Sequence, residues 1–320
     1  MLESVKIAIV GTGDLGTTTA YALLLSNLAA EIVLINVDQT KAQRDAMDLN
    51  RSVAFAHQTR IRAGKYDDCA GAAIITITAG TNQKRGQTRV DLVRNNVLLF
   101  RDVVPEVTRH GANAILIVAT DPVDVLTYAS WKLSGFPPSR VIGLGTILAT
   151  ARFRYLLGQH FGIDPQSVHA YIIGEHGDSE VPVWSLANIA GIRLWEFCQH
   201  EGLTYNEPEM QSIFRQARNA FDETIKGTSA TFYAVASGVV RIVEAILRDQ
   251  NTLLTVSSVV QHYGISEVCV SLPTKVNRNG AEHILHLPLN QEELSGLVKC
   301  AESVKASIAK LNLDRSAGAA

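Results

Sequence analysis

The sequence lacks most features that mark membrane, secreted or nucleic-acid-binding proteins. It has no run of about 18 apolar residues, which excludes the usual membrane-spanning helix. Met1 is followed almost directly by a strand-like segment instead of a basic and apolar leader. Charged residues make up only 19% of the 320 residues and nearly cancel, to a net charge of -2, so neither nucleic acid nor a membrane surface is an expected partner. We therefore expect a cytoplasmic protein.

Cysteine is also scarce. The four cysteines lie far apart and form no CxxC pair, at Cys69, Cys198, Cys269 and Cys300. Disulfide frameworks and zinc sites need cysteines at short, regular spacings, so we expect four reduced thiols and no metal. The apolar fraction of 47% is large enough for a buried core.

What the sequence does contain, up to about residue 145, is an alternation of strand-like and helix-like segments. The predicted strands are short apolar runs, at 5–10, 32–35, 73–79 and 114–119. The predicted helices have amphipathic patterns, at 14–26, 40–52 and 89–110. Such alternation indicates βαβ units and a mostly parallel sheet that is covered on both faces.

The pattern changes after about residue 145. Strand-like segments become shorter and more polar, at 167–173 and 267–273, and long helical stretches follow, at 206–247 and 291–310. The fold class is therefore α/β. We predict a Rossmann-type parallel-sheet domain over residues 1–145, followed by an α+β substrate domain over residues 146–320 that does not extend the first sheet.

A GxGxxG sequence follows the first predicted strand and opens the first predicted helix. Gly11 permits a tight turn, Gly13 lets the backbone approach a pyrophosphate, and Gly16 lets the helix pack closely on the strand. Asp14 and Leu15 begin the helix, whose N-terminus presents free N–H groups to an anion. We predict that a dinucleotide binds at these five residues.

The position that usually holds the ribose hydroxyls, at the end of the second strand, is occupied by Asn36 and not by an acid. Asparagine can bond a hydroxyl but has no negative charge to repel a 2′-phosphate. Asp38 lies two residues further on and could serve instead, while Lys41 and Arg44 are nearby. We predict NAD as the cofactor, with NADP as the alternative.

Six segments together resemble the L-lactate/L-malate dehydrogenase family along nearly the whole chain, and most of all its bacterial L-lactate dehydrogenases. They are GTGDLG (11–16), KAQRDAMDL (41–49), AGTNQKRGQTR (79–89), DPVDVLTY (121–128), TARFRYLL (150–157) and IGEHGDSEVPVWS (173–185). The resemblance implies hydride transfer between a nicotinamide cofactor and C2 of a small 2-oxo acid, which gives an L-2-hydroxy acid. It also implies a homotetramer, or at least a dimer.

The resemblance assigns roles to single residues. His176 matches the family's acid/base histidine, whose ordinary pKa suits reversible proton transfer. Arg152 matches the arginine that grips the substrate carboxylate with a bidentate guanidinium. Arg89 matches the arginine that closes over the substrate and polarises the ketone, and the loop before it, 80–88, could act as a lid.

Further positions are assigned in the same way. Ala79 and Gly80 are placed at the cofactor, and Val235 against the nicotinamide. Thr231 matches a substrate-contacting threonine, although plain packing would also explain Thr231 and Val235. Gln83 stands where the family's malate enzymes have an arginine for a second carboxylate. A neutral residue there favours a monocarboxylic substrate such as pyruvate.

Two positions depart from the family pattern. Asp121 stands where the family has asparagine, and Ala149 stands where it has the aspartate that pairs with the catalytic histidine. One hypothesis is that Asp121 lies near His176 and takes over the missing role. A second is that the substrate is an imine or ketimine, whose positive charge Asp121 would attract. A third is a catalytically degenerate homologue that only binds nucleotide. We predict the dehydrogenase.

A regulatory site is a further expectation. Arg154 and His169 match a pair that binds fructose bisphosphate between subunits in allosteric bacterial lactate dehydrogenases. The alternative is that Arg154 pairs locally and that His169 packs in a strand.

Overall fold

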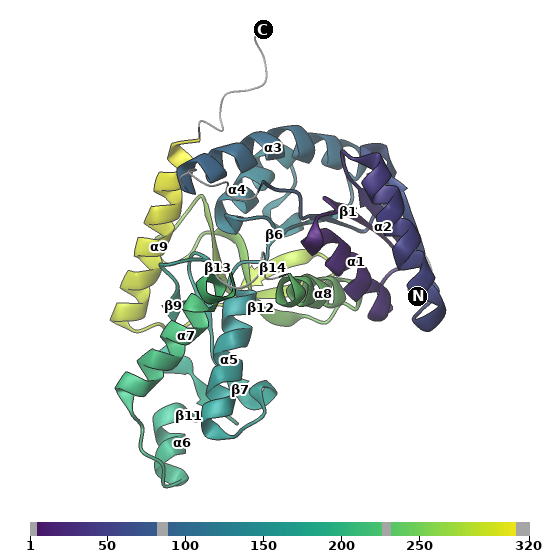
Figure 1. The fold of residues 1–320 in the computed structure, drawn as a ribbon. Coiled ribbons are helices and arrows are strands. Elements are labelled where there is room, and N and C mark those ends of the chain that lie inside the picture. The colour runs from purple at the N-terminus through teal and green to yellow at the C-terminus, as the bar shows by residue number, and fades with distance from the viewer. Residues whose placement is uncertain (1–4, 82–88, 226–231, 312–320) are drawn as a thin grey trace.

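The computed structural model describes residues 5–81, 89–225 and 232–311, and only the backbone of residues 89–90 and 220–225 (Figure 1). The strands of the first half are β1 (Lys6–Val10), β2 (Glu31–Ile35), β3 (Arg60–Gly64), β4 (Ile74–Ile77), β5 (Ile115–Val118) and β6 (Val141–Gly143). Its helices are α1 (Asp14–Leu25), α2 (Gln39–Ser52), α3 (Arg89–His110) and α4 (Val123–Ser134). The helices and strands predicted here are confirmed, with ends displaced by one or two residues.

The strands β1 to β6 form a parallel sheet in the order β6-β5-β4-β1-β2-β3. Helices α3 and α4 lie together on one face, and α1 lies with a later helix, α8, on the other (Figure 1). The strand order reverses between β4 and β1, and in such sheets a crevice for ligands opens at the carboxyl ends of the strands at this point. The predicted Rossmann-type fold class is confirmed.

The second half contains short strands, three long strands and five helices among the described residues. Its strands are β7 (Val168–His169), β8 (Ile172–Ile173), β9 (Val181–Pro182), β10 (Asn188–Ile189), β11 (Ile192–Arg193), β12 (Thr252–Val260), β13 (Val268–Asn277) and β14 (Gly280–Ile284). Its helices are α5 (Ile147–Phe161), α6 (Leu194–His200), α7 (Glu207–Ile225), α8 (Tyr233–Leu247) and α9 (Gln291–Ala309).

The prediction that this half does not extend the first sheet was wrong. Strands β12, β13 and β14 run antiparallel and join the edge of the parallel sheet, which thereby has nine strands in the described part of the chain. The junction is a single pair, Ser257 with Gly143. It depends on the missing side chain of Gly143, since a Cβ there would lie 2.1 Å from Thr127 Oγ1 and 3.0 Å from Ser257 Cβ. The strand predicted at 167–173 is in fact two strands, β7 and β8, in two different sheets.

Two buried clusters hold these layers together. The larger one fills both faces of the nine-stranded sheet. The smaller one packs α5 against α7 and the small strands, in the lobe that extends away from the sheet in Figure 1. Phe153 is fully buried at its centre, edge-on to Trp184 at 4.9 Å and to Phe214 at 6.3 Å between ring centroids. All four cysteines are buried free thiols. None of the described helices is long and apolar enough to cross a membrane.

Candidate active site

The glycine loop lies between the end of β1 and the start of α1. Its three glycines differ in the space that surrounds each of them. Gly11 has a φ of 102°, and a Cβ there would lie 2.5 Å from the backbone nitrogen of Ala79. At Gly16 a Cβ would lie 1.9 Å from the carbonyl oxygen of Gly11. At Gly13, the N-cap of α1, a Cβ would meet nothing within 4 Å. The open space at Gly13, beside the helix N-terminus, is a cradle that fits a pyrophosphate.

The end of β2 is tied to this loop. The Asn36 side-chain amide donates to Thr12 Oγ1 at 2.7 Å, and its oxygen accepts from the backbone nitrogen of Asp38 at 2.9 Å. Asp38 caps α2 by accepting from the backbone nitrogen of Lys41 at 2.9 Å. The ammonium of Lys41 bonds the carbonyl oxygen of Thr12 and pairs with Asp45 at 2.7 Å. Asn36 thus braces the glycine loop, and a cation lies close to the cofactor side of β2.

A buried asparagine that the sequence did not single out connects the next two strand ends. Asn96, on α3, accepts from the backbone nitrogen of Thr81 at 2.8 Å and from its hydroxyl at 2.9 Å. Its amide donates to the carbonyl oxygen of Asp121 at 2.8 Å. Only 1% of Asn96 is exposed. The segment after β4, which begins with Ala79 and Gly80, is therefore held beside the segment after β5.

His176 follows β8 and is held at two atoms. Its backbone nitrogen donates to Asp124 Oδ2 at 2.7 Å, and Asp124 Oδ1 accepts from the Ser257 hydroxyl at 2.6 Å. Its ring nitrogen Nδ1 lies 3.0 Å from Glu180 Oε1. Nδ1 is thereby engaged by a carboxylate.

The surroundings of His176 shift its pKa upward. Burial would lower it, but the hydrogen bond to Glu180 and the negative charges around the ring outweigh burial and raise the pKa of His176 to about 9. Those charges belong to Asp121, Glu180 and Asp124. Burial also raises the pKa of Asp124 to about 7, against the opposing effect of the hydrogen bonds that it accepts. The His176 ring is therefore protonated at neutral pH.

Arg152, on α5, lies close enough to Glu180 for its charge to act on the guanidinium. Its Nη1 donates to the carbonyl oxygen of Ala217 on α7 at 2.8 Å, which holds the half-buried guanidinium in place. Burial lowers the pKa of Arg152, and the charge of Glu180 opposes that shift. The structure thus brings together Arg152, His176 and Asp121, all predicted from the sequence, with Glu180 among them.

The two unusual positions differ in their surroundings. Asp121 is exposed, directly after β5, and acts on His176 through its charge. Ala149 is 4% exposed and belongs to the apolar cluster around Phe153. Asp121 is thus near enough to act on His176, as the hypothesis expected, but the hydrogen-bond partner of Nδ1 is Glu180.

Some predicted residues are outside the described part of the chain. Gln83 and Thr231 fall in the gaps, and of Arg89 only the backbone is described, as the first residue of α3. Val235 lies on α8, half-buried against the larger cluster.

Arg154 and His169 are in contact within the chain. Arg154 Nη2 lies 3.1 Å from His169 Nδ1, and Arg154 Nε bonds the carbonyl oxygen of Val168 at 2.5 Å. Burial lowers the pKa of Arg154. The side chain of His169 is exposed on β7.

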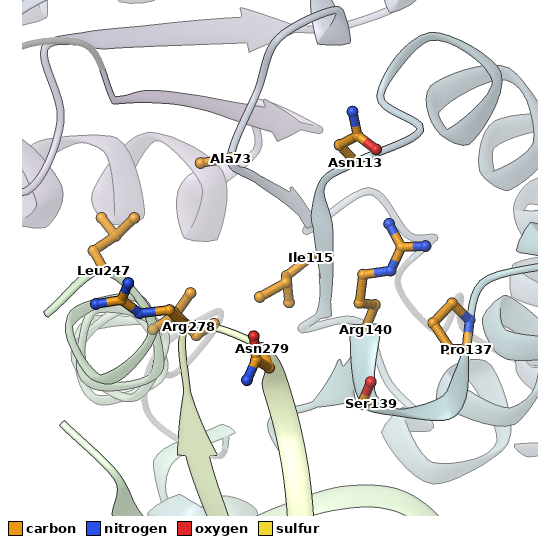
Figure 2. Close-up of a pocket in the computed structure, with 10 residues that line it drawn as sticks. Ala73, Asn113, Ile115, Pro137, Ser139, Arg140, Leu247, Arg278 and Asn279 are labelled. Carbon is orange, nitrogen blue, oxygen red and sulfur yellow. The ribbon is translucent and has the colours of Figure 1, made fainter. Parts of the chain in front are cut away.

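Figure 2 shows a pocket of about 550 Å³ at the opposite, amino edge of the sheet. Arg140 and Arg278 approach it from two sides over an apolar floor that includes Ile115 and Leu247. Arg278 is already paired with Asp249 at 2.8 Å. None of the predicted site residues lines this pocket, so it is separate from the candidate active site.

Two family models match this chain. Residues 5–143 match the model of the lactate/malate dehydrogenase NAD binding domain, and residues 146–313 that of the lactate/malate dehydrogenase alpha/beta C-terminal domain. A probable L-lactate dehydrogenase of Schizosaccharomyces pombe is 50% identical over 312 residues, which are 98% of this chain and 94% of that protein.

Other relatives are bacterial. The L-lactate dehydrogenase of Acetivibrio thermocellus is 49% identical over 309 residues, 96% of this chain and 98% of its own. The crystal structure of the minor L-lactate dehydrogenase of Enterococcus mundtii superposes with a TM-score of 0.94 at 38% identity, and covers 97% of this chain and 99% of that one.

Proposed function

The chain belongs to the lactate/malate dehydrogenase family, and from this premise we propose how it works as an L-lactate-like dehydrogenase that uses NAD. Its substrate is a small monocarboxylic 2-oxo acid, reduced reversibly to the L-2-hydroxy acid. The relatives support this function and not the imine reductase or the degenerate homologue. The observation that carries the proposal is that Glu180 is close to both residues, since its carboxylate lies 3.0 Å from Nδ1 of His176 and its negative charge raises the pKa of Arg152 against the effect of burial.

Three residues of the chain have separate roles in the proposed reaction. NAD, when bound, exchanges a hydride with C2 of the substrate. Arg152 holds the substrate carboxylate, since a guanidinium matches two carboxylate oxygens, and the bond to Ala217 keeps it oriented. His176 donates the proton to the ketone oxygen from Nε2, because Nδ1 is occupied by Glu180. Arg89 closes over the ketone and polarises it.

Finer parts of the proposal come from the sequence. Gln83 leaves a second carboxylate without a partner and so selects pyruvate over oxaloacetate. Thr231 contacts the substrate, and Val235 packs on the nicotinamide. NAD is preferred to NADP, although Asn36 brings no negative charge against a 2′-phosphate.

We also propose that the chain forms two domains, at 1–145 and 146–320, and that it assembles as a homotetramer in the cytoplasm. Arg154 and His169, which already share a contact, meet their symmetry mates there and bind fructose bisphosphate as an activator.

The test is a substrate screen with purified protein. Pyruvate, oxaloacetate and a cyclic imine are compared with NADH and NADPH, by the rate of cofactor oxidation. We expect pyruvate with NADH to give the highest kcat/KM, and Gln83→Arg to shift the preference toward oxaloacetate. An imine reduced faster than every 2-oxo acid, or no hydride transfer at all, would overturn the proposal.

The two unusual positions are tested in the same assay. If Ala149→Asp with Asp121→Asn raises pyruvate turnover by about 100-fold or more, the site has been retuned away from pyruvate. We expect no gain of that size, because Glu180 already occupies Nδ1 of His176.

A further inference from the structure

We propose that Glu180, and not Asp121, is the residue that positions the proton-transferring histidine, in place of the family carboxylate that is missing at Ala149. The inference rests on the proposed acid/base function of His176. It assigns a role to a side chain that the sequence comparison with the family did not single out.

The contact is direct and fixes the ring. Glu180 Oε1 lies 3.0 Å from Nδ1 of His176, a distance typical of a charge-assisted hydrogen bond. A carboxylate at Nδ1 keeps the proton there and so leaves Nε2 to exchange its proton with the substrate. The backbone of the same histidine is anchored separately by Asp124. The ring and the main chain are thus held by two different carboxylates.

The burial of Glu180 makes the pairing necessary. Its side chain is only 3% exposed, and among the described residues its Oε2 has no hydrogen-bond partner. A buried carboxylate without a counter-charge is costly, so Glu180 favours a protonated His176 and the nearby guanidinium of Arg152. One carboxylate therefore serves both the proton donor and the substrate clamp.

Local backbone geometry brings the pair together outside any helix. Glu180 comes four residues after His176 and directly before β9. Between them Gly177 has a φ of 151°, and its carbonyl oxygen accepts from the backbone nitrogen of Glu180 at 3.3 Å. This turn directs both side chains to the same side.

The other carboxylates near the ring have different positions. Asp121 lies on the loop after β5 and is exposed, so that water screens its charge. Asp124 lies on α4, and its two carboxylate oxygens accept hydrogen bonds from the Ser257 hydroxyl and from the backbone nitrogen of His176. Neither is the partner of Nδ1.

The experiment is a pH titration of His176 by NMR in the NAD-free protein labelled with ¹⁵N-histidine, together with the pH profile of kcat/KM for pyruvate. The variants are Glu180→Gln, Glu180→Asp and Asp121→Asn. Glu293→Gln is the matched control, because Glu293 is also buried, at 5% exposed, but caps α9 and bonds Ser185.

We expect a pKa of about 9 for His176 in the wild type and a fall toward the ordinary value of 6.5 in Glu180→Gln. At about pH 8 the protonated fraction would drop from about nine tenths to about one thirtieth, so pyruvate reduction should fall roughly 30-fold. Glu180→Asp keeps the charge and should restore part of both readouts. Glu293→Gln should lower the melting temperature without moving the titration.

The proposal is overturned if Glu180→Gln leaves the His176 titration in place, or if Asp121→Asn lowers it more than Glu180→Gln does. It is also overturned if Glu293→Gln moves the titration as far, since the effect would then be general. A wild type that transfers no hydride to any 2-oxo acid would refute the proposed function, whereas the pairing is judged from the NMR titration alone.

Discussion

Alanine at two glycines of the same loop should separate the folding role of a glycine from its binding role. In Gly16→Ala the new methyl group would lie 1.9 Å from the carbonyl oxygen of Gly11 and 2.8 Å from Thr78 Oγ1. The first contact is with backbone, which cannot rotate away, so α1 must shift from β1. Overpacking of this kind costs about 1–3 kcal/mol and occasionally more, and we expect a value of about 3 kcal/mol or above.

Gly13→Ala should behave in the opposite way. Its φ of -70° and ψ of -174° suit alanine, and a Cβ would meet nothing within 4 Å. The free energy of unfolding should stay constant or rise by about 0.4–1 kcal/mol, because alanine restricts the unfolded chain. The methyl group would, however, fill the space where the pyrophosphate approaches. We expect NADH to bind at least about 10-fold more weakly, a loss of about 1.4 kcal/mol.

Two measurements check the pair: urea unfolding of the NAD-free variants and titration with NADH by fluorescence. The reasoning is refuted if Gly13→Ala is destabilised as much as Gly16→Ala, or if it binds NADH like the wild type. The first result would mean that the loop is more tightly packed than the structure shows. The second would mean that the pyrophosphate lies elsewhere.

Four further predictions concern His176, the carboxylate that anchors its backbone, and the smaller buried cluster. Since His176 has a pKa of about 9, kcat/KM for pyruvate reduction should stay constant up to about pH 9 and then fall. The kcat/KM for lactate oxidation, which needs the unprotonated ring, should rise over the same pH range. Profiles with a midpoint near pH 6.5 would contradict this prediction. The same raised pKa stabilises the fold fully below pH 6.5, so the melting temperature should decline as pH rises through about 9. Asp124→Ala removes both acceptor oxygens, so that the Ser257 hydroxyl and the backbone nitrogen of His176 lose these hydrogen bonds; kcat should fall while circular dichroism stays unchanged, and an unaffected kcat would show that this anchor is dispensable. Phe153→Ala should lose about 3–5 kcal/mol in urea unfolding, against less than about 0.5 kcal/mol for Phe55→Ala at a side chain that is 92% exposed; similar losses for both would exclude Phe153 as the centre of its cluster.

The local sequence was enough to predict the Rossmann half of the fold. Buried parallel strands are continuous apolar runs, and the helices between them have an apolar face, so most of these elements are visible within their own windows. The short or polar strands β3 and β6 carried no such signal, because β3 lies at the sheet edge and β6 has only three residues. The glycine loop also followed from a short motif whose spacing reflects its chemistry, whereas the proposed roles of His176 and Arg152 came from the resemblance to the family.

Only the tertiary structure determined which side chains meet. Ser257 and Asp124 are 133 residues apart and Asn96 and Asp121 are 25 apart, and no periodicity relates them. The pair of His176 and Glu180 is close in sequence, but it depends on an irregular turn around Gly177 that no helix or strand pattern reveals. The same holds for β12, which joins the first sheet through one close approach at Gly143. Hydrophobic patterning is a property of residues that are close in the sequence. Which side chains form hydrogen bonds, and which strands pair at the edge of a sheet, depends on how the whole chain packs.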